Sequence, residues 1–250
     1  MSIRAVFFDA GETLVAPHPS FHELFARVMR REGLDVSGAE AERALQAGIP
    51  SIVEVLERTG NDTWSTSREV SRQFWRSIYS TAFDELGIDD SHGRLFEALY
   101  HRFRQHDSYR LFPDALPALH GLREAGLVLG VISNWEEWLE SLLVTMEVAE
   151  LFDVIVVSGR VGIEKPDARI FHLALEQAGV EPAEAVYVGD HPKLDVEASE
   201  AVGMVPVLVD RRGRHPEHPG TRITELGELP RVIGLGGGLA APASGRGRPS

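Results

Sequence analysis

The sequence predicts an α/β fold in which helices cover both faces of a parallel sheet and one long insertion interrupts it. Short apolar segments alternate with helical patterns, and nearly continuous apolar strands are typical of a sheet buried on both faces. Roughly 115 residues separate the first two strands, whereas later strands follow at about 20 to 30 residues, the usual length of a βα unit. The expected strands are residues 3–9, 127–133, 154–158, 185–190 and 205–210.

The insertion, residues 16 to about 108, is expected to be almost wholly helical. Two of its segments have the spacing of a capping box at a helix start, namely Ser37 with Glu40 and Thr66 with Glu69. Its apolar residues recur at helical spacing in three stripes. The stripes are Phe21, Leu24, Phe25 and Val28, then Val70, Phe74 and Ile78, then Leu95, Leu99 and Phe103.

The aromatic residues of the insertion are interpreted as core packing rather than as a ligand-binding box, because they fall on the helical stripes. They are Trp64, Trp75, Tyr79, Phe83 and Tyr100. The remaining chain divides into a sheet-containing core, residues 1–15 and 109–234, and a Gly- and Pro-rich segment, residues 235–250. The composition of that last segment predicts a disordered tail.

Composition excludes several classes of function. The chain has 25 Lys and Arg against 38 Asp and Glu, a net charge of −13, which repels nucleic acids and anionic membrane surfaces. It has no cysteine, which excludes thiolate catalysis and Cys-ligated zinc, so any metal must bind oxygen or imidazole. No apolar run has the length of a membrane span or the pattern of a signal peptide. We therefore expect a cytoplasmic protein that binds neither nucleic acid nor membrane.

Chemically useful side chains are expected at the carboxyl ends of the strands, which meet at one edge of a parallel sheet. Carboxylates gathered there repel one another unless a cation neutralises them, and a hard divalent ion such as Mg²⁺ prefers oxygen ligands. In chain order, the candidates are Asp9 and Thr13 after strand one, Ser133 and Asn134 after strand two, Lys165 after strand three, and Asp190 and Asp195 after strand four.

The order of these residues resembles that of the haloacid dehalogenase-like (HAD) hydrolase superfamily, whose members carry four motifs on a Rossmann-like core. The motifs appear here as FFDAGETL (residues 7–14), VISNW (131–135), the lysine of GIEKPDARIF, and VGDHPKLD (188–195). The resemblance covers roughly residues 3–210, and the helical insertion after the first motif is similar to the C1-type cap of that superfamily.

The resemblance implies a Mg²⁺-dependent phosphatase that acts on a small phosphorylated metabolite. Asp9 would attack phosphorus to give an aspartyl-phosphate, and Lys165 would stabilise the charge on both groups. Thr13 and Ser133 would hold the phosphoryl oxygens, and Asn134 would bind substrate or orient its loop. The implied Mg²⁺ ligands are Asp9, Asp190, Asp195 and the backbone carbonyl of Gly11.

One position departs from the family pattern. Phosphatases of this superfamily carry a second Asp two residues after the nucleophile, as general acid and base, and this chain has Gly11 there, followed by Glu12. A general acid typically contributes about 10²- to 10⁴-fold, so its absence weakens hydrolysis of poor leaving groups without preventing attack by Asp9. Glu12 is a candidate replacement, although adjacent strand residues point to opposite faces.

The absence of this acid keeps two alternatives open. A 2-haloacid dehalogenase of the same superfamily also uses the first Asp without the second, because halide leaves unprotonated, but it needs no Mg²⁺. A binding or regulatory protein could keep the fold and the metal without useful turnover. The acidic pair Asp190 and Asp195 favours phosphoryl transfer over the dehalogenase, which needs no metal site.

Overall fold

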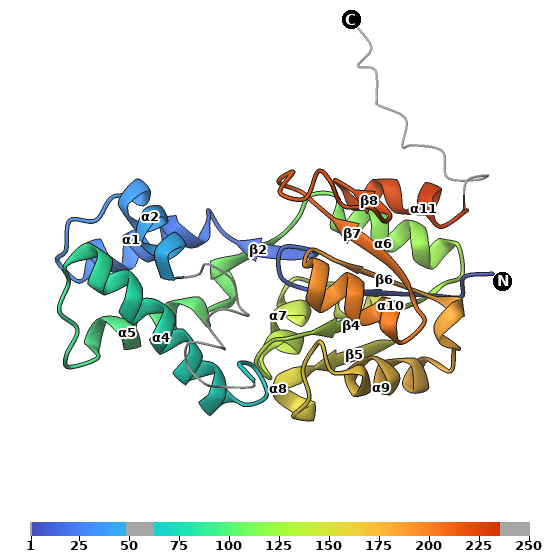
Figure 1. Ribbon diagram of the computed structural model, residues 1–250, viewed down its shortest axis with the longest axis horizontal. Coiled ribbons are helices and arrows are strands. Elements are labelled where there is room, and N and C mark those ends of the chain that lie inside the picture. Colours follow the sequence, from blue (N-terminus) through green and yellow to red (C-terminus); the bar gives the residue numbers. More distant parts are fainter. Residues whose placement is uncertain (1, 49–62, 236–250) are drawn as a thin grey trace, which may run out of the picture.

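A computed structural model describes residues 2–48 and 63–235 of the chain (Figure 1). Its centre is a six-stranded parallel sheet with strand order β5-β4-β1-β6-β7-β8. This architecture confirms the predicted α/β fold, and the first strand lies in the interior of the sheet, between β4 and β6. The strands of this sheet are β1 (Ala5–Phe8), β4 (Val128–Ser133), β5 (Val154–Val157), β6 (Ala185–Gly189), β7 (Val205–Val209) and β8 (Arg222–Ile223).

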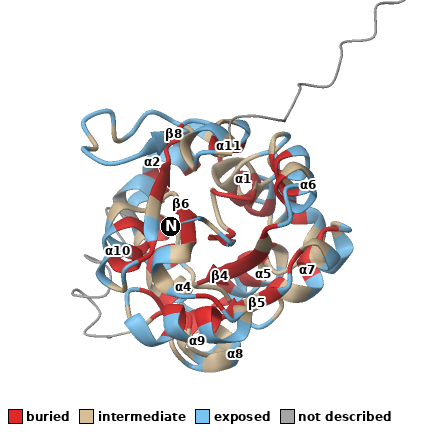
Figure 2. Cartoon of the chain, turned by 90° about the vertical axis from the view of Figure 1, so that its right-hand side faces the viewer, coloured by how far each residue is buried: buried red, intermediate tan, exposed pale blue. Residues whose placement is uncertain are grey.

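Both faces of the sheet are buried because side chains alternate along each strand. On β1, Val6 and Phe8 join the cluster beneath α6, α7 and α11, whereas Ala5 and Phe7 join the cluster beneath α9 and α10. Figure 2 shows these strands as a buried interior surrounded by helices with exposed outer faces. The helices are α6 (Ala115–Glu124), α7 (Leu139–Thr145), α8 (Ser158–Val161), α9 (Ala168–Ala178), α10 (Ala198–Ala201) and α11 (Leu229–Val232), and a π-helical turn spans Pro192–Glu197.

Residues 16–108, called the helical region below, have a hydrophobic cluster of their own. An antiparallel pair of short strands, β2 and β3, leads from the sheet to this region and back (Figure 1). Neither strand was predicted, since each spans three residues and so carries little periodic signal. The elements are β2 (Val15–Pro17), α1 (Phe21–Arg31), α2 (Gly38–Gly48), α4 (Arg68–Leu86), α5 (Arg94–Phe103) and β3 (Tyr109–Leu111).

The two predicted helix starts have different outcomes. The Ser37 hydroxyl accepts a hydrogen bond from the Glu40 N–H, and the Glu40 carboxylate accepts one from the Ser37 N–H, which confirms this capping box. The start predicted at Thr66 is wrong by one residue. Ser67 caps α4 by accepting from the N–H of Val70, because its backbone, not that of Thr66, occupies the N-cap position.

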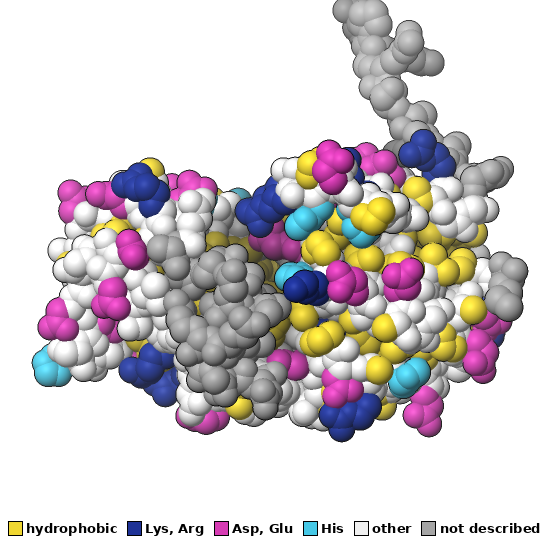
Figure 3. Space-filling view, in the orientation of Figure 1, with side chains coloured by type: hydrophobic (Ala, Val, Ile, Leu, Met, Phe, Trp, Pro, Cys, Tyr) yellow, Lys and Arg dark blue, Asp and Glu magenta, His cyan; other side chains and the backbone are white. Residues whose placement is uncertain are grey.

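The surface agrees with the acidic composition. Acidic and basic side chains are interspersed over the described part of the face in Figure 3. Among the described residues, no helix combines the length and the apolar composition needed to cross a membrane. The predicted disordered tail lies, except for Leu235, outside the described residues.

Candidate active site

Asp9 directly follows β1 and is 7% exposed. Its backbone N–H donates to the carbonyl of Val188 at 2.9 Å, which continues the pairing of β1 with β6 and fixes the direction of the side chain. Oδ1 accepts from Ser133 Oγ at 3.0 Å and from Lys165 Nζ at 2.8 Å. Oδ2 accepts from no described residue and lies on the side of Gly11, so it is the oxygen available for attack. Burial raises the pKa of Asp9, although the adjacent Lys165 ammonium opposes this effect.

Lys165 bonds three side chains of the site at once. Its Nζ donates to Asp9 Oδ1, to Asp195 Oδ1 at 2.6 Å and to the Tyr187 hydroxyl at 2.8 Å, which uses all three of its N–H groups. The Tyr187 hydroxyl donates in turn to the carbonyl of Ile132 at 2.8 Å. Burial lowers the pKa of Lys165, but the carboxylates of Asp195 and Asp9 outweigh burial and hold it well above 10.5. The lysine is therefore a fixed positive charge.

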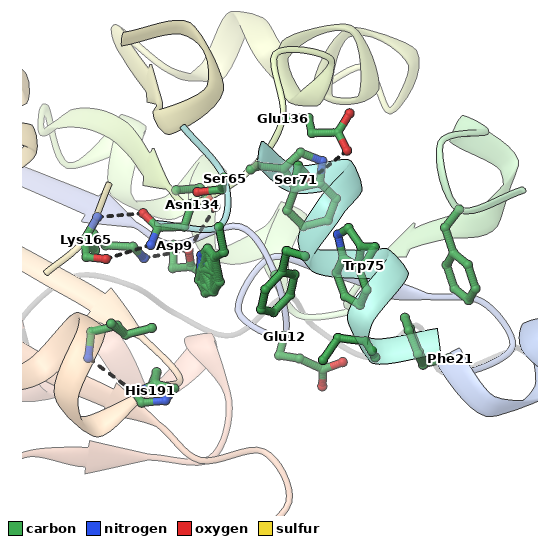
Figure 4. Close-up of a pocket in the computed structure, with 18 of the residues that line it drawn as sticks. Asp9, Glu12, Phe21, Ser65, Ser71, Trp75, Asn134, Glu136, Lys165 and His191 are labelled. Carbon is green, nitrogen blue, oxygen red and sulfur yellow. Dashed lines mark hydrogen bonds and ion pairs between the residues drawn. The ribbon is translucent and has the colours of Figure 1, made fainter. Parts of the chain in front are cut away.

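Asn134 holds the lysine in place through its backbone. The Asn134 Nδ2 donates to the Lys165 carbonyl at 2.8 Å, and its Oδ1 accepts from the Lys165 N–H at 2.7 Å (Figure 4). Both polar atoms of the amide are thus engaged by the chain at Lys165. This geometry favours the orienting role over direct substrate binding.

Three carboxylates converge beside the lysine. Asp9, Asp190 and Asp195 each offer an oxygen, and these oxygens lie within 4.8 Å of one another. Asp195 is held by the backbone N–H of His191, which donates to its Oδ2 at 2.9 Å. Gly189 makes room for this side chain, because a Cβ there would lie 2.3 Å from the Asp195 Cγ. The predicted acidic residues are therefore brought together as one cluster.

This cluster fits a divalent cation. Three carboxylates face one ammonium, so negative charge remains in excess. Burial, followed by the charges of Asp195 and Asp9, raises the pKa of Asp190 well above 3.8. Such repulsion is what a hard cation on oxygen ligands relieves. Gly11 lies next to Asp9 and supplies a backbone carbonyl as a further candidate ligand.

Thr13 lies in the tight turn that follows Asp9, in which Leu14 and Val15 both donate their N–H to the Ala10 carbonyl. It is fully buried, does not line the cavity around Asp9, and its Oγ1 has no hydrogen-bond partner among the described residues. Its role in holding phosphoryl oxygens therefore stays a prediction.

Neither Gly11 nor Glu12 places an acidic side chain beside Asp9. A Cβ at Gly11 would lie 3.3 Å from Cζ3 of Trp135 and 4.0 Å from Asp9 Oδ2, so Trp135 occupies the space beside it. Glu12 has a left-handed backbone with φ of 55°, and its carboxylate is 2.7 Å from Nη2 of Arg212. The Glu12 carboxylate is therefore paired at the rim of the cavity rather than turned toward Asp9.

A cavity of about 340 Å³ extends from Asp9 to the helical region. Sequence analysis assigned the aromatic residues of this region to core packing, and all five do belong to its hydrophobic cluster. Four of them nevertheless also line the cavity, so the interpretation was incomplete: Trp64, Trp75, Tyr79 and Tyr100. Their second role depends on how the helices face the sheet, which helical periodicity does not specify.

A buried carboxylate, Glu136, lies in the wall of this cavity and was not predicted. Its Oε1 accepts from Ser71 Oγ at 2.8 Å and from Tyr100 OH at 2.9 Å (Figure 4). Nε of Arg104 lies 3.0 Å from Oε2, an ion pair whose alignment is too poor for a hydrogen bond. Nη2 of Arg104 also donates to Glu137 at 3.3 Å. Glu136 and Arg104 thus neutralise each other.

A second unpredicted carboxylate, Glu164, joins the core to the helical region. It accepts from the backbone N–H of Trp64 at 3.0 Å and from the N–H and the hydroxyl of Ser65 at 2.7 and 2.6 Å. We call these contacts the Glu164 clamp. Because Glu164 precedes Lys165, the clamp ties the segment at Lys165 to the helical region.

Comparison with known proteins matches residues 3–203 to the model of a hydrolase family, haloacid dehalogenase-like hydrolase. Haloacid dehalogenase-like hydrolase domain-containing protein 3 of Mus musculus is 32% identical over 211 residues, covering 84% of this chain and 82% of the relative. Glyceraldehyde 3-phosphate phosphatase of Methanopyrus kandleri is 37% identical over 226 residues, covering 86% and 87%.

Solved structures show the same architecture. A crystal structure of a dehalogenase superimposes with a TM-score of 0.67 at 26% identity, covering 92% of this chain and 97% of that one. The chain therefore resembles both a phosphatase in sequence and a dehalogenase in structure.

Proposed function

Because the chain belongs to the haloacid dehalogenase-like hydrolase family, we propose that it is a Mg²⁺-dependent phosphatase that cleaves a small phosphorylated metabolite through an aspartyl-phosphate at Asp9. The observation that carries this proposal is the cluster of Asp9, Asp190 and Asp195 around the ammonium of Lys165. A site with this excess of negative charge can receive a phosphate dianion only if a cation is bound as well.

The metal ligands in this proposal are Asp9, Asp190, Asp195 and the Gly11 carbonyl. A bound Mg²⁺ would neutralise negative charge on the carboxylates and on the phosphate. The remaining chemistry belongs to side chains. Lys165 and Ser133 both bond Oδ1 of Asp9 and so leave Oδ2 as the attacking atom.

In the proposed reaction, Asp9 Oδ2 forms a bond to phosphorus, and the bond from phosphorus to the leaving oxygen breaks with its electron pair on that oxygen. Lys165 stabilises the charge that accumulates on Asp9 and on the transferred group. Water then cleaves the aspartyl-phosphate and releases inorganic phosphate. The products are an alcohol or phenol and phosphate, and Asp9 is regenerated.

The helical region is proposed to act as an inserted cap of the C1 type, with residues 16–108 as cap and residues 1–15 and 109–234 as core. Two features support this division. The helical region has a hydrophobic cluster built almost wholly from its own residues, and it contributes to the wall of the cavity that Asp9 also lines.

Phosphate release measured with and without Mg²⁺ tests the proposal. We expect Mg²⁺-dependent release from p-nitrophenyl phosphate that falls by at least about 10³-fold in Asp9→Asn, because the nucleophile is lost. Asp190→Asn should raise the Mg²⁺ concentration needed for half-maximal activity. Asp35→Asn, an exposed carboxylate outside the cluster, is the matched control and should behave as the wild type. Undiminished activity in Asp9→Asn contradicts the mechanism.

A dehalogenase is the second candidate, and Gly11 is the observation that favours it, since halide needs no acid. Metal-independent release of chloride from 2-chloropropionate, without release of phosphate, would establish it in place of the phosphatase. Mg²⁺ binding in calorimetry with neither phosphate nor chloride release would indicate a binding or regulatory protein instead.

A further inference from the structure

We infer that the phosphoryl group is carried by an uncharged aromatic ring, so that the substrate is an aryl phosphate monoester. This inference rests on the proposed phosphatase function and narrows its substrate class. Two separate features of the cavity lead to it: the rings and charges at the end remote from Asp9, and the missing acid at the end beside Asp9.

The remote end of the cavity is lined by rings from α1, α4 and α5. Phe21 and Phe103 are stacked with centroids 4.5 Å apart, and Trp75 and Tyr79 are stacked with centroids 5.7 Å apart. The interplanar angles within these pairs are 29° and 28°, so the rings pack against one another and form a continuous aromatic wall. Figure 4 shows Phe21 and Trp75 across the cavity from Asp9 and Lys165. A flat apolar group on the phosphate would stack against this wall.

Among the described residues, the charged side chains at the remote end of the cavity are already paired with one another. Arg104 is the basic residue of the cavity wall in this part of the described chain, and it is already paired with the carboxylates of Glu136 and Glu137. A carboxylate on the substrate would have to compete with both of these partners. An ammonium would have to replace Arg104 at Glu136, which also accepts two hydroxyl hydrogen bonds. An uncharged group requires neither exchange.

The residues beside Asp9 favour a leaving group of low pKa. Gly11 offers no proton, and the Glu12 carboxylate is paired with Arg212. The leaving oxygen must therefore depart largely as an anion and take its proton from water afterwards. A phenol, with a pKa of about 10 as in tyrosine, tolerates this far better than an aliphatic alcohol, whose pKa is far higher and close to that of water. An aromatic ring thus satisfies both ends of the cavity.

The first test compares esters with Mg²⁺ present. We expect kcat/KM for phenyl phosphate to exceed that for glycerol 2-phosphate and O-phosphoserine by at least about 10²-fold, the contribution of a general acid that the alkyl esters lack here. We also expect 2-naphthyl phosphate to exceed phenyl phosphate through a lower KM, since the two leaving groups have similar acidity and differ in ring area.

The second test changes the aromatic wall. Trp75→Ala should lower the ratio of kcat/KM for 2-naphthyl phosphate over acetyl phosphate by about tenfold, mainly through KM, because stacking is lost while the small acyl phosphate does not reach the wall. Trp75 is only partly buried, which favours folding of the variant. Val144→Ala, at an exposed position on α7, is the control and should leave the ratio unchanged.

The third test does not depend on turnover. Calorimetry with 2-naphthylphosphonate and methylphosphonate, whose carbon–phosphorus bonds resist hydrolysis, should show at least tenfold tighter binding of the aromatic compound. Equal binding of the two phosphonates overturns the inference. Faster turnover of O-phosphoserine than of phenyl phosphate also overturns it, while leaving the phosphatase function intact. Absence of phosphate release from every ester, including acetyl phosphate, refutes the proposed function itself, and the phosphonates then still report on the ring preference.

Discussion

The two ends of the cavity are built on different physical principles. Beside Asp9, charged groups from three segments of the chain are fixed by direct hydrogen bonds, with Lys165 at their centre. At the remote end, ring packing dominates, and the charged pair Glu136 and Arg104 is neutral overall. In the proposed reaction, electrostatics position the reacting atoms, and we expect shape and apolar contact to select the group that the phosphate carries. The two ends should therefore respond differently to substitution.

The largest effect is expected at Lys165. Lys165→Met leaves the buried carboxylates of Asp9 and Asp195 without their cation, which should cost about 3–5 kcal/mol of unfolding free energy and lower kcat by about 10²- to 10³-fold or more. Urea unfolding without metal and steady-state kinetics measure the two effects. The double variant Lys165→Met with Asp195→Asn should recover part of the stability but none of the rate. A single variant as stable as the wild type would show that the lysine is not needed to neutralise the cluster.

The next effect concerns the Glu164 clamp, which connects the two ends. Glu164→Ala removes the acceptor for two backbone N–H groups and the Ser65 hydroxyl, and we expect a loss of about 2–3 kcal/mol. Hydrogen exchange should accelerate at Trp64 and Ser65, and KM should rise more than kcat falls. Ser65→Ala removes one bond of the clamp and serves as the graded control, with an expected loss of about 1 kcal/mol. Unchanged exchange at Trp64 in Glu164→Ala would mean that the clamp does not hold this segment.

A smaller effect is expected at Asp190, where substitution should raise the unfolding free energy of the metal-free protein rather than lower it. The pKa of this residue is raised in the folded protein, so the folded state holds a proton that the unfolded state releases above a pKa of about 3.8. Unfolding free energy without metal should therefore fall as pH rises from about 3.8 through the folded-state pKa. Asp190→Asn removes this penalty and should raise the metal-free Tm at pH 7.5 by about 2–4 °C, equivalent to about 1 kcal/mol.

Mg²⁺ should reverse the order of thermal stability of the wild type and Asp190→Asn. Addition of Mg²⁺ should raise the Tm of the wild type but not that of Asp190→Asn, because binding to the folded state alone stabilises it. Thermal scans at several pH values with and without Mg²⁺ measure both effects. A wild-type Tm that rises with pH across this window without metal would contradict the sign of the argument.

The sequence predicted well the features that depend on local spacing. Apolar strands identified the sheet, and because parallel strands end at one edge, Asp9, Lys165, Asp190 and Asp195 could be expected to meet. The full burial of Thr13 was not predicted, because this residue lies in a tight turn that closes on the Ala10 carbonyl. Residue type and distance from Asp9 along the chain do not reveal that turn.

The features that were missed depend on contacts between distant segments. Glu164 bonds Trp64 across 100 residues, and Glu136 bonds Ser71 across 65. One of these contacts could have been anticipated at Tyr187. A tyrosine within the otherwise apolar strand VYVG needs a partner for its hydroxyl. Which partner it finds, here Lys165 and Ile132, follows only from the pairing of β6 with β1 and of β1 with β4.

The smallest effect is expected from restoring an acid at residue 11. Considered from the sequence alone, Gly11→Asp should raise the rate of hydrolysis of alkyl phosphates by about 10²-fold, because it supplies the missing general acid. The structure reduces this expectation, because the new Cβ would lie 3.3 Å from Trp135, and this indole is held by Tyr109 and Trp138 at centroid distances of 5.4 and 5.3 Å. We therefore expect a gain below about threefold and a loss of about 1 kcal/mol from overpacking, as in Gly11→Ala.

The double variant Gly11→Asp with Trp135→Leu separates acid chemistry from space. Leucine is smaller than the indole and remains apolar, so the carboxyl group gains room beside Asp9 Oδ2. If the missing acid limits the rate, the double variant should hydrolyse glycerol 2-phosphate about 10²-fold faster than Trp135→Leu alone, with little gain on phenyl phosphate, whose leaving group needs no proton. Equal gains on both esters would indicate that a wider cavity, rather than a proton donor, had raised the rate.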